Sequence, residues 1–208
     1  MRKITTSLIF LTFCTITMAQ KIPIIYYDST DNGKTYTSLQ EALQEPKKVY
    51  RLKLTKLANR DSLPEELFLL TELRELTVKG CRLCVLNQNI YKLTKLESLN
   101  LDKNKLLRLP ESIGNLKNLK YLCISRNIIE TLPNSISNLS RLTYIDAWDN
   151  PLYILPESIK SLQKTLQILD LRQIPLTKSE YKAMQELLPD TEILFTDICE
   201  CENRRDHN

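Results

Sequence analysis

Hydrophobic and polar positions follow a fixed order in the middle of the chain, and this order repeats. In the stretch LESLNLDKNKLLRLPESIGNL, which begins at Leu96, apolar residues stand at positions 1, 4, 6, 11, 14, 18 and 21. The same offsets recur from Leu119 and again from Leu142, so successive units begin 23 residues apart. A period of this length is typical of a solenoid, in which each unit stacks on the next.

One unit contains the signals of a strand, a turn and a short helix. Leu99 and Leu101 alternate with polar neighbours, which indicates a half-buried strand. Proline disfavours helix at the residue before it, so Leu109-Pro110 predicts a turn. Ile113 and Leu116 then lie three apart and can share one face of a helical turn. Because one unit has a single apolar face, only stacking on a copy can bury it.

Stacked units place their strands side by side in a parallel sheet, about 4.8 Å apart. The helical side needs more room than the strand side. We therefore expect an α/β solenoid with a curved parallel sheet on the concave face and short helices or 3-10 turns on the convex face.

The pattern LxxLxLxxNxLxxLPxxIxxL, nearly unbroken from Leu96 and from Leu119, resembles the leucine-rich repeat family, in its secreted bacterial type. The resemblance extends over roughly residues 38–195. It implies a leucine-rich-repeat solenoid and a non-catalytic module that binds a protein or peptide on its concave face.

The first 19 residues carry the features of a secretory signal peptide. Arg2 and Lys3 precede an apolar run over 8–16, and small residues end at Ala19. We therefore expect export to the periplasm, the cell surface or the medium. A membrane anchor would need about 20 apolar residues, and a lipoprotein signal at Cys14 is disfavoured by the bulky Phe13 before it.

The mature chain has the length of one domain. We expect an N-terminal extension and capping helix over 20–48, about six repeats over 49–176, a C-terminal cap over 177–198 and a tail over 199–208. Capping boxes begin at Ser38 and Thr177, and each predicts the start of a helix.

Composition argues against several classes of function. The formal net charge of +4 falls to +2 without Arg2 and Lys3, which is too little to indicate nucleic-acid binding. The single histidine, His207, lies in the tail, which argues against histidine-based nucleophilic catalysis and against histidine zinc sites. We expect no metal, no cofactor, no catalytic residue and a monomeric protein.

Five cysteines remain after the signal peptide, which is an odd number for an exported chain. They are Cys81, Cys84, Cys123, Cys199 and Cys201. Cys81 stands where the family pattern has asparagine and is expected to be a buried thiol. A local Cys81–Cys84 disulfide stays open.

Three asparagines, Asn104, Asn127 and Asn150, recur at one position of successive repeats. Each stands where the chain leaves the strand and turns. Buried backbone N–H and C=O groups at such a turn need partners, and a side-chain amide can donate and accept. The spacing predicts a structural asparagine ladder.

Side chains that flank the strand leucines are expected to face solvent on the concave face. Repeats one to three place small or charged groups there, and repeats four to six place aromatic ones. The predicted partner-binding residues are Tyr121, Arg126, Tyr144, Asp146, Trp148, Asp149, Ile168, Asp170 and Arg172. Exposed Trp, Tyr and Arg dominate the energetics of interfaces, although these aromatics could also only stack across strands.

Two other functions stay open for this surface. Tyrosine and tryptophan beside aspartate would also suit carbohydrate binding at the cell surface. Asp146 and Asp170 fall at the same position of adjacent strands, about 5 Å apart, which is the carboxylate separation of retaining glycosidases and should raise one pKa. Two solvated acids, neutralised by Arg126 or Arg172, are the plainer interpretation, and a weak cation site is a third.

Overall fold

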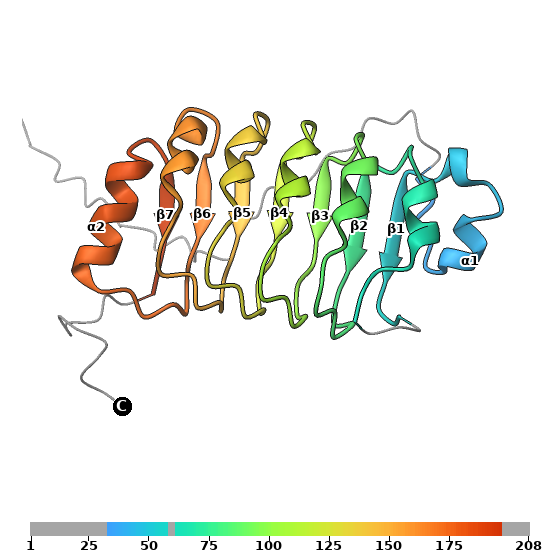
Figure 1. Ribbon diagram of the computed structural model, residues 1–208, viewed down its shortest axis with the longest axis horizontal. Helices are drawn as coiled ribbons and strands as arrows, with labels where there is room; N and C mark the ends of the chain where they lie inside the picture. Colours follow the sequence, from blue (N-terminus) through green and yellow to red (C-terminus); the bar gives the residue numbers. More distant parts are fainter. Residues whose placement is uncertain (1–32, 58–60, 197–208) are drawn as a thin grey trace, which may run out of the picture. The chain divides into compact units, whose positions relative to one another are not determined.

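The structure is a computed structural model that describes residues 33–57 and 61–196. These residues form a stack of coils, each of which contributes one short strand to a parallel sheet of seven strands (Figure 1). The strands are β1 (Arg51–Leu54), β2 (Glu75–Val78), β3 (Ser98–Asn100), β4 (Tyr121–Cys123), β5 (Tyr144–Asp146), β6 (Ile168–Asp170) and β7 (Glu192–Leu194). The predicted signal peptide and tail lie outside the described residues.

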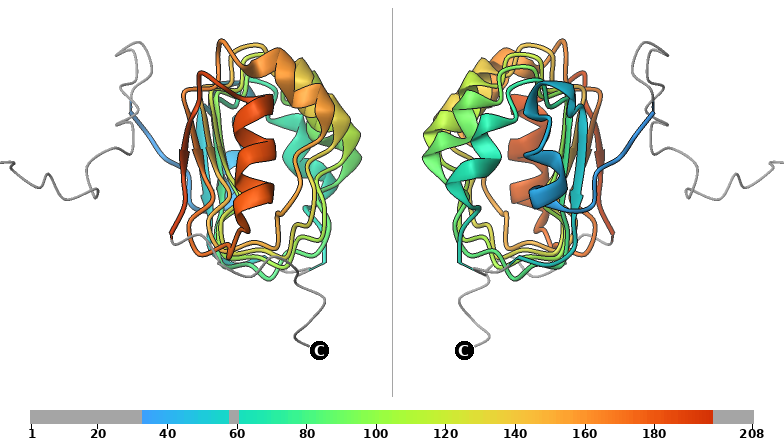
Figure 2. Two further views of the ribbon diagram at one scale, coloured as in Figure 1. Left: turned by 90° about the vertical axis from the view of Figure 1, so that its left-hand side faces the viewer. Right: turned by 90° about the vertical axis from the view of Figure 1, so that its right-hand side faces the viewer.

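Short 3-10 helices lie on the side opposite the sheet (Figure 2). They are η3 (Glu65–Leu69), η4 (Gln88–Lys92), η5 (Glu111–Asn115), η6 (Asn134–Asn138) and η7 (Glu157–Leu162). Pro110, Pro133 and Pro156 each stand immediately before such a turn, in extended backbone. The expected α/β solenoid is confirmed. The seven strands form one uncurled sheet, and the turns opposite it are short 3-10 helices. We call its exposed surface the strand face and the opposite surface the turn face.

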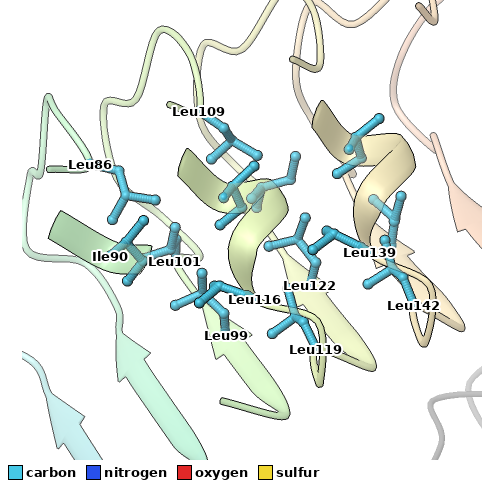
Figure 3. Packing of buried hydrophobic residues seen from close by; sticks show 14 of the residues in the cluster. Leu86, Ile90, Leu99, Leu101, Leu109, Leu116, Leu119, Leu122, Leu139 and Leu142 are labelled. Atoms are coloured by element: carbon cyan, nitrogen blue, oxygen red, sulfur yellow. The ribbon is translucent and has the colours of Figure 1, made fainter. Parts of the chain in front are cut away.

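The repeating leucines fill the space between the strands and the turns (Figure 3). Leu99 from β3 and Leu116 from the end of η5 are fully buried, and Leu122 from β4 continues the same column in the next repeat. Full burial of one leucine side chain contributes about 1.5–3 kcal/mol. Since every repeat contributes a similar set, the core runs without interruption through the stack.

Neighbouring turns approach closely at one glycine. A Cβ atom added to Gly114 in η5 would lie 2.5 Å from the carbonyl oxygen of Ser135 in η6. No real side chain has that contact, so the two turns would have to move apart. The glycine therefore lets adjacent repeats pack tightly on the turn face.

The first edge of the sheet is covered, and the last strand forms the other edge. Beside β1, the backbone of Tyr36 pairs with Leu52, and the short helix α1 (Leu39–Ala42) follows. Beside β6, the last strand β7 closes the sheet, preceded by α2 (Lys178–Leu187). Covered edges protect a sheet from pairing with other chains.

The two predicted capping boxes differ in the structure. At α2 the box is complete, because Thr177 accepts from the Glu180 N–H and Glu180 accepts from the Thr177 N–H. At α1 the Ser38 hydroxyl accepts from the Glu41 N–H at 3.4 Å, but the Glu41 carboxylate forms an ion pair with Lys34 instead. Only the serine half of the first box is formed.

Candidate binding site on the strand face

The asparagine positions hold the turns at the ends of the strands. The Asn127 side-chain oxygen accepts from the Leu106 N–H at 3.0 Å, and its nitrogen donates to the Leu101 carbonyl at 3.0 Å and to its own turn at 2.8 Å. Asn104 and Asn150 make the equivalent bonds in their repeats. Each amide thus joins its own turn to the preceding one and fixes the positions of the strand ends.

One row of side chains changes character along the strand face. At its N-terminal end, Arg51 and Glu75 form an ion pair at 2.6 Å across β1 and β2. Farther along, Tyr121, Tyr144 and Ile168 stand at the same register of β4, β5 and β6, and each is half-buried. We call these three residues, together with Trp148, the aromatic patch.

Trp148 is half-buried beneath a cation. The Arg126 guanidinium lies 5.1 Å from the centre of the indole ring, which is a cation–π distance. Trp148 also lines a shallow pocket of about 370 Å³ with Arg172, Gln173 and Thr196. The indole is therefore only partly open to solvent, with one ring face covered by Arg126.

Arg126 is held in place by a buried carboxylate. Its Nε donates to Asp102 at 2.8 Å, while Lys79 and the Ser125 hydroxyl approach the same carboxylate at 2.9 and 3.1 Å. Burial favours the neutral acid, but these three partners outweigh it and lower the pKa of Asp102. Asp102 and Ser125 also flank strand leucines, for which exposure was expected, but both are buried because their side chains bond to each other inside this network.

The expected exposure of Asp170 is also wrong. Asp170 is only 1% exposed, so it does not face solvent as expected. The Arg172 Nε donates to the Asp170 carboxylate at 2.9 Å, and the Arg172 backbone N–H donates at 3.1 Å. The carboxylate is buried because Arg172 closes over it, while the Arg172 side chain remains 44% exposed.

Asp146 stands beside Asp170 in register and has a different environment. It accepts from the Cys123 thiol at 3.3 Å and from the Trp148 N–H at 3.2 Å. Burial raises the pKa of Asp146, and the neighbouring charge of Asp170 adds to that rise. The last predicted contact, Asp149, is exposed in the following turn, with a φ of 56°.

The thiol beside Asp146 is also perturbed. Burial, with a smaller contribution from Asp146, raises the pKa of Cys123 to about 12. Burial likewise raises the pKa of Tyr144. A protonated thiol is a poor nucleophile and can donate a hydrogen bond, as the Cys123 thiol does to Asp146.

The described cysteines are free thiols. Cys81 is buried as expected, and no disulfide joins it to Cys84. Its sulfur lies 3.6 Å from the Leu54 carbonyl, which is a weak hydrogen bond. Cys199 and Cys201 lie outside the described residues.

The sequence pattern did not single out a row of cations beside the aromatic patch. The row follows the turns at the carboxyl ends of the strands, and we call it the cationic edge. It consists of Lys56, Lys79, Lys103, Arg126 and Arg172. The signal was present at the seventh and eighth positions of each repeat, where five of twelve residues are basic.

Within residues 33–57 and 61–196, no three His, Cys, Asp or Glu side chains are grouped so that they could hold a metal ion. Among the same residues, none of the helices has both the length and the apolar character needed to cross a bilayer. The functional groups of the strand face are the half-exposed side chains of the aromatic patch and the cations of the cationic edge.

A family model described as a leucine-rich repeat region matches residues 88–193, which is more than half of the chain. The chain belongs to the leucine-rich repeat family. Proteins of this family are generally non-catalytic binding modules. No curated protein matches the chain.

Solved structures resemble this leucine-rich repeat protein. A leucine-rich repeat protein of Leptospira interrogans is 27% identical with a TM-score of 0.55, over 77% of this chain and 52% of that one. The internalin InlF of Listeria monocytogenes is 18% identical with a TM-score of 0.58, and the match covers 80% of this chain and 55% of that one. The internalin InlC2 of the same organism is 22% identical with a TM-score of 0.57, and the match covers 78% of this chain and 67% of that one. The chain thus spans about half the length of the first two, and the internalins show the fold alone.

Proposed function

We propose that this leucine-rich repeat protein is a non-catalytic module that binds a protein or peptide on the strand face of repeats four to six. The observation that carries the proposal is the row of Tyr121, Tyr144 and Ile168, in register and half-exposed, with Trp148 beside it. Residues of these types supply most of the binding energy at interfaces. The family and its fold support the same class of function.

Stacking for stability alone is a weaker explanation of the aromatic patch. Within the described residues, the two rings in close contact are those of Tyr181 and Phe195, whose centres lie 4.3 Å apart. No such ring contact joins Tyr121 and Tyr144 in that part of the chain. Their half-exposed surfaces are therefore free for a ligand.

A capture experiment tests the proposal. The chain from Gln20 onward is immobilised, bound proteins from a cell-surface extract are identified by mass spectrometry, and the affinity of a purified binder is measured. We expect Tyr121→Ala with Tyr144→Ala to weaken that affinity by at least about 2 kcal/mol. Tyr91→Ala is the matched control, since Tyr91 is 44% exposed on the turn face.

The proposal is wrong if the double variant, shown to be folded by circular dichroism, binds as tightly as the wild type. It is equally wrong if Tyr91→Ala has the larger effect, because the partner would then contact the turn face.

Carbohydrate binding is the alternative function for this surface. Sugar rings stack on open aromatic faces, and the Arg126 guanidinium already covers one face of Trp148. Asp149 and the exposed part of Tyr144 could still contact sugar hydroxyls. A glycan array separates the two functions, because specific glycan binding without a protein binder would favour the alternative. A screen with generic glycoside substrates is expected to be negative, since Asp170 is engaged by Arg172.

Export and a monomeric state are further parts of the proposal. Residues 1–19 are expected to direct the chain out of the cytoplasm. Fractionation of cells that express the chain with and without residues 2–19 tests this, because only the complete chain should reach the exported fraction. Sedimentation analysis of the purified chain tests the monomer.

A further inference from the structure

The cationic edge borders the aromatic patch and has a fixed geometry. The turn that follows each strand is bonded to the next one: the Lys103 N–H donates to the Ser125 carbonyl at 3.0 Å, and the Arg126 N–H donates to the Trp148 carbonyl at 2.8 Å. Neighbouring strands of a sheet are about 4.8 Å apart. The turns that carry Lys103 and Arg126 are therefore held about one strand spacing apart, whereas the fifth repeat places no cation at this edge.

The backbone conformation at this edge is unusual. Lys103 and Arg126 have φ values of 59° and 52°, and Gly80 at the same position of the preceding repeat has 68°. A non-glycine residue rarely has a positive φ. The eighth position keeps this conformation in successive repeats, and Asp149 and Gln173 share it with φ values of 56° and 60°.

The carboxylates that accompany the edge leave its cations available. Asp102 is 3% exposed and is shared by Lys79 and Arg126, whose side chains remain 48% and 35% exposed. One buried negative charge thus faces two accessible cations. Arg172, paired with the buried Asp170, adds a third accessible cation.

Two lysines of the edge lack a counter-ion in this part of the structure. Lys56 and Lys103 are exposed, and neither takes part in an ion pair within residues 33–57 and 61–196. Asp149 is the exposed carboxylate among the seventh and eighth positions of the repeats. The edge therefore carries a surplus of accessible positive charge.

We infer that the partner of the strand face is an acidic polypeptide segment, whose carboxylates contact the cationic edge and whose aromatic or aliphatic side chains contact the aromatic patch. This inference rests on the proposed function and names the class of partner. Complementary charge steers association and suppresses wrong partners. The adjacent row of Tyr121, Tyr144 and Ile168 favours a polypeptide over a nucleic acid or a sulfated glycan, because those polyanions bring no apolar side chains to that row.

A random copolymer of glutamate and tyrosine is a suitable probe for this combination of groups. The chain has a single tryptophan, and it lies in the aromatic patch, so tryptophan fluorescence reports binding at the site itself. We expect saturable binding with a Kd below about 1 mM, weaker binding of polyglutamate, and a loss of affinity with added salt.

Charge reversal at the edge is the decisive comparison. Lys56→Glu with Lys103→Glu should weaken copolymer binding about tenfold. Lys92→Glu with Lys164→Glu, at exposed lysines on or beside the turns η4 and η7, changes the net charge equally and should alter binding less than about twofold. Melting curves verify that all four substitutions leave the chain folded.

Four results would overturn the inference. They are no saturable binding of the copolymer, equal losses in both double variants, no loss in the Lys56 and Lys103 variant, or tighter binding of heparin than of the copolymer. The proposed function has a separate test, because Tyr121→Ala with Tyr144→Ala would still weaken binding of a captured protein if only the acidic class were wrong. A tenfold loss confined to the edge variant supports the inference.

Discussion

The N-terminal and C-terminal halves of the strand face share one backbone and carry different chemistry. The third position of the repeats holds the Arg51–Glu75 ion pair at one end and Tyr121, Tyr144 and Ile168 at the other. Ion pairs near the surface contribute little net energy, whereas aromatic side chains release more when a partner covers them. A regular scaffold can therefore concentrate binding in one half while the other supplies charge.

Two carboxylates show the same contrast. Asp102 is held ionised by Arg126 and Lys79, and its pKa is lowered. Asp146, two strands farther along, has a thiol and a backbone N–H as its partners, and burial raises its pKa. The pKa values of these two aspartates are thus shifted in opposite directions, because hydrogen bonds from cations outweigh burial only at Asp102.

The largest expected effect concerns the ladder that both halves share. Asn127→Ala removes bonds to two turns and should lower the free energy of unfolding by about 1–3 kcal/mol, since buried backbone groups lose their partners. Cys81→Ala is the matched change in the N-terminal half, where only weak sulfur bonds are lost. Urea denaturation compares the two, and an equal cost would mean that the amide bonds add little.

Trp148→Ala tests whether partner binding is concentrated in the C-terminal half of the strand face. We expect partner binding to weaken by about 2 kcal/mol, measured by calorimetry with the captured protein. Stability should fall by about 1 kcal/mol or less, because Asp102 still holds Arg126. If the variant unfolds instead, the indole belongs to the core and not to the aromatic patch.

Asp102→Asn should cost about 1 kcal/mol of stability at neutral pH by removing the charge that pairs with Arg126 and Lys79. The pKa of Asp102 is lower in the folded state, so its contribution is present above the unfolded pKa of about 3.9 and is lost as the pH falls through the folded value. The difference between wild type and variant should therefore vanish in acid. A difference that grows on acidification would contradict this account.

Asp146→Asn has the smallest expected effect and the opposite pH dependence. Because the folded pKa of Asp146 is raised, the unfolded state releases its proton first, and the wild type loses stability as the pH rises from about 3.9 to the folded value. The variant should equal or exceed the wild type at neutral pH by about 0.5 kcal/mol. Denaturation curves at several pH values measure it, and parallel profiles for the two aspartate variants would remove the contrast.

The positions of strands and core residues were predictable from the repeat. Leu99 and Leu101 alternate with polar neighbours, and both are buried at the places the period requires. The form of the turn side was less predictable, because Ile113 and Leu116 suit an α-helical or a 3-10 turn equally well. The 3-10 turn was adopted, and the sheet is uncurled.

The sequence by itself determined the stacking, because a unit with one apolar face is stable only against its copy. The tertiary structure decided which polar groups of the strand face are accessible. Asp102 and Asp170 are buried while Lys103 is exposed, although all three occupy outward positions. At Asp102 the reason is that residues about 23 positions apart become neighbours only in the stack, and their hydrogen bonds and charges then turn the carboxylate inward. Asp170 is instead buried by Arg172, two residues farther along the chain.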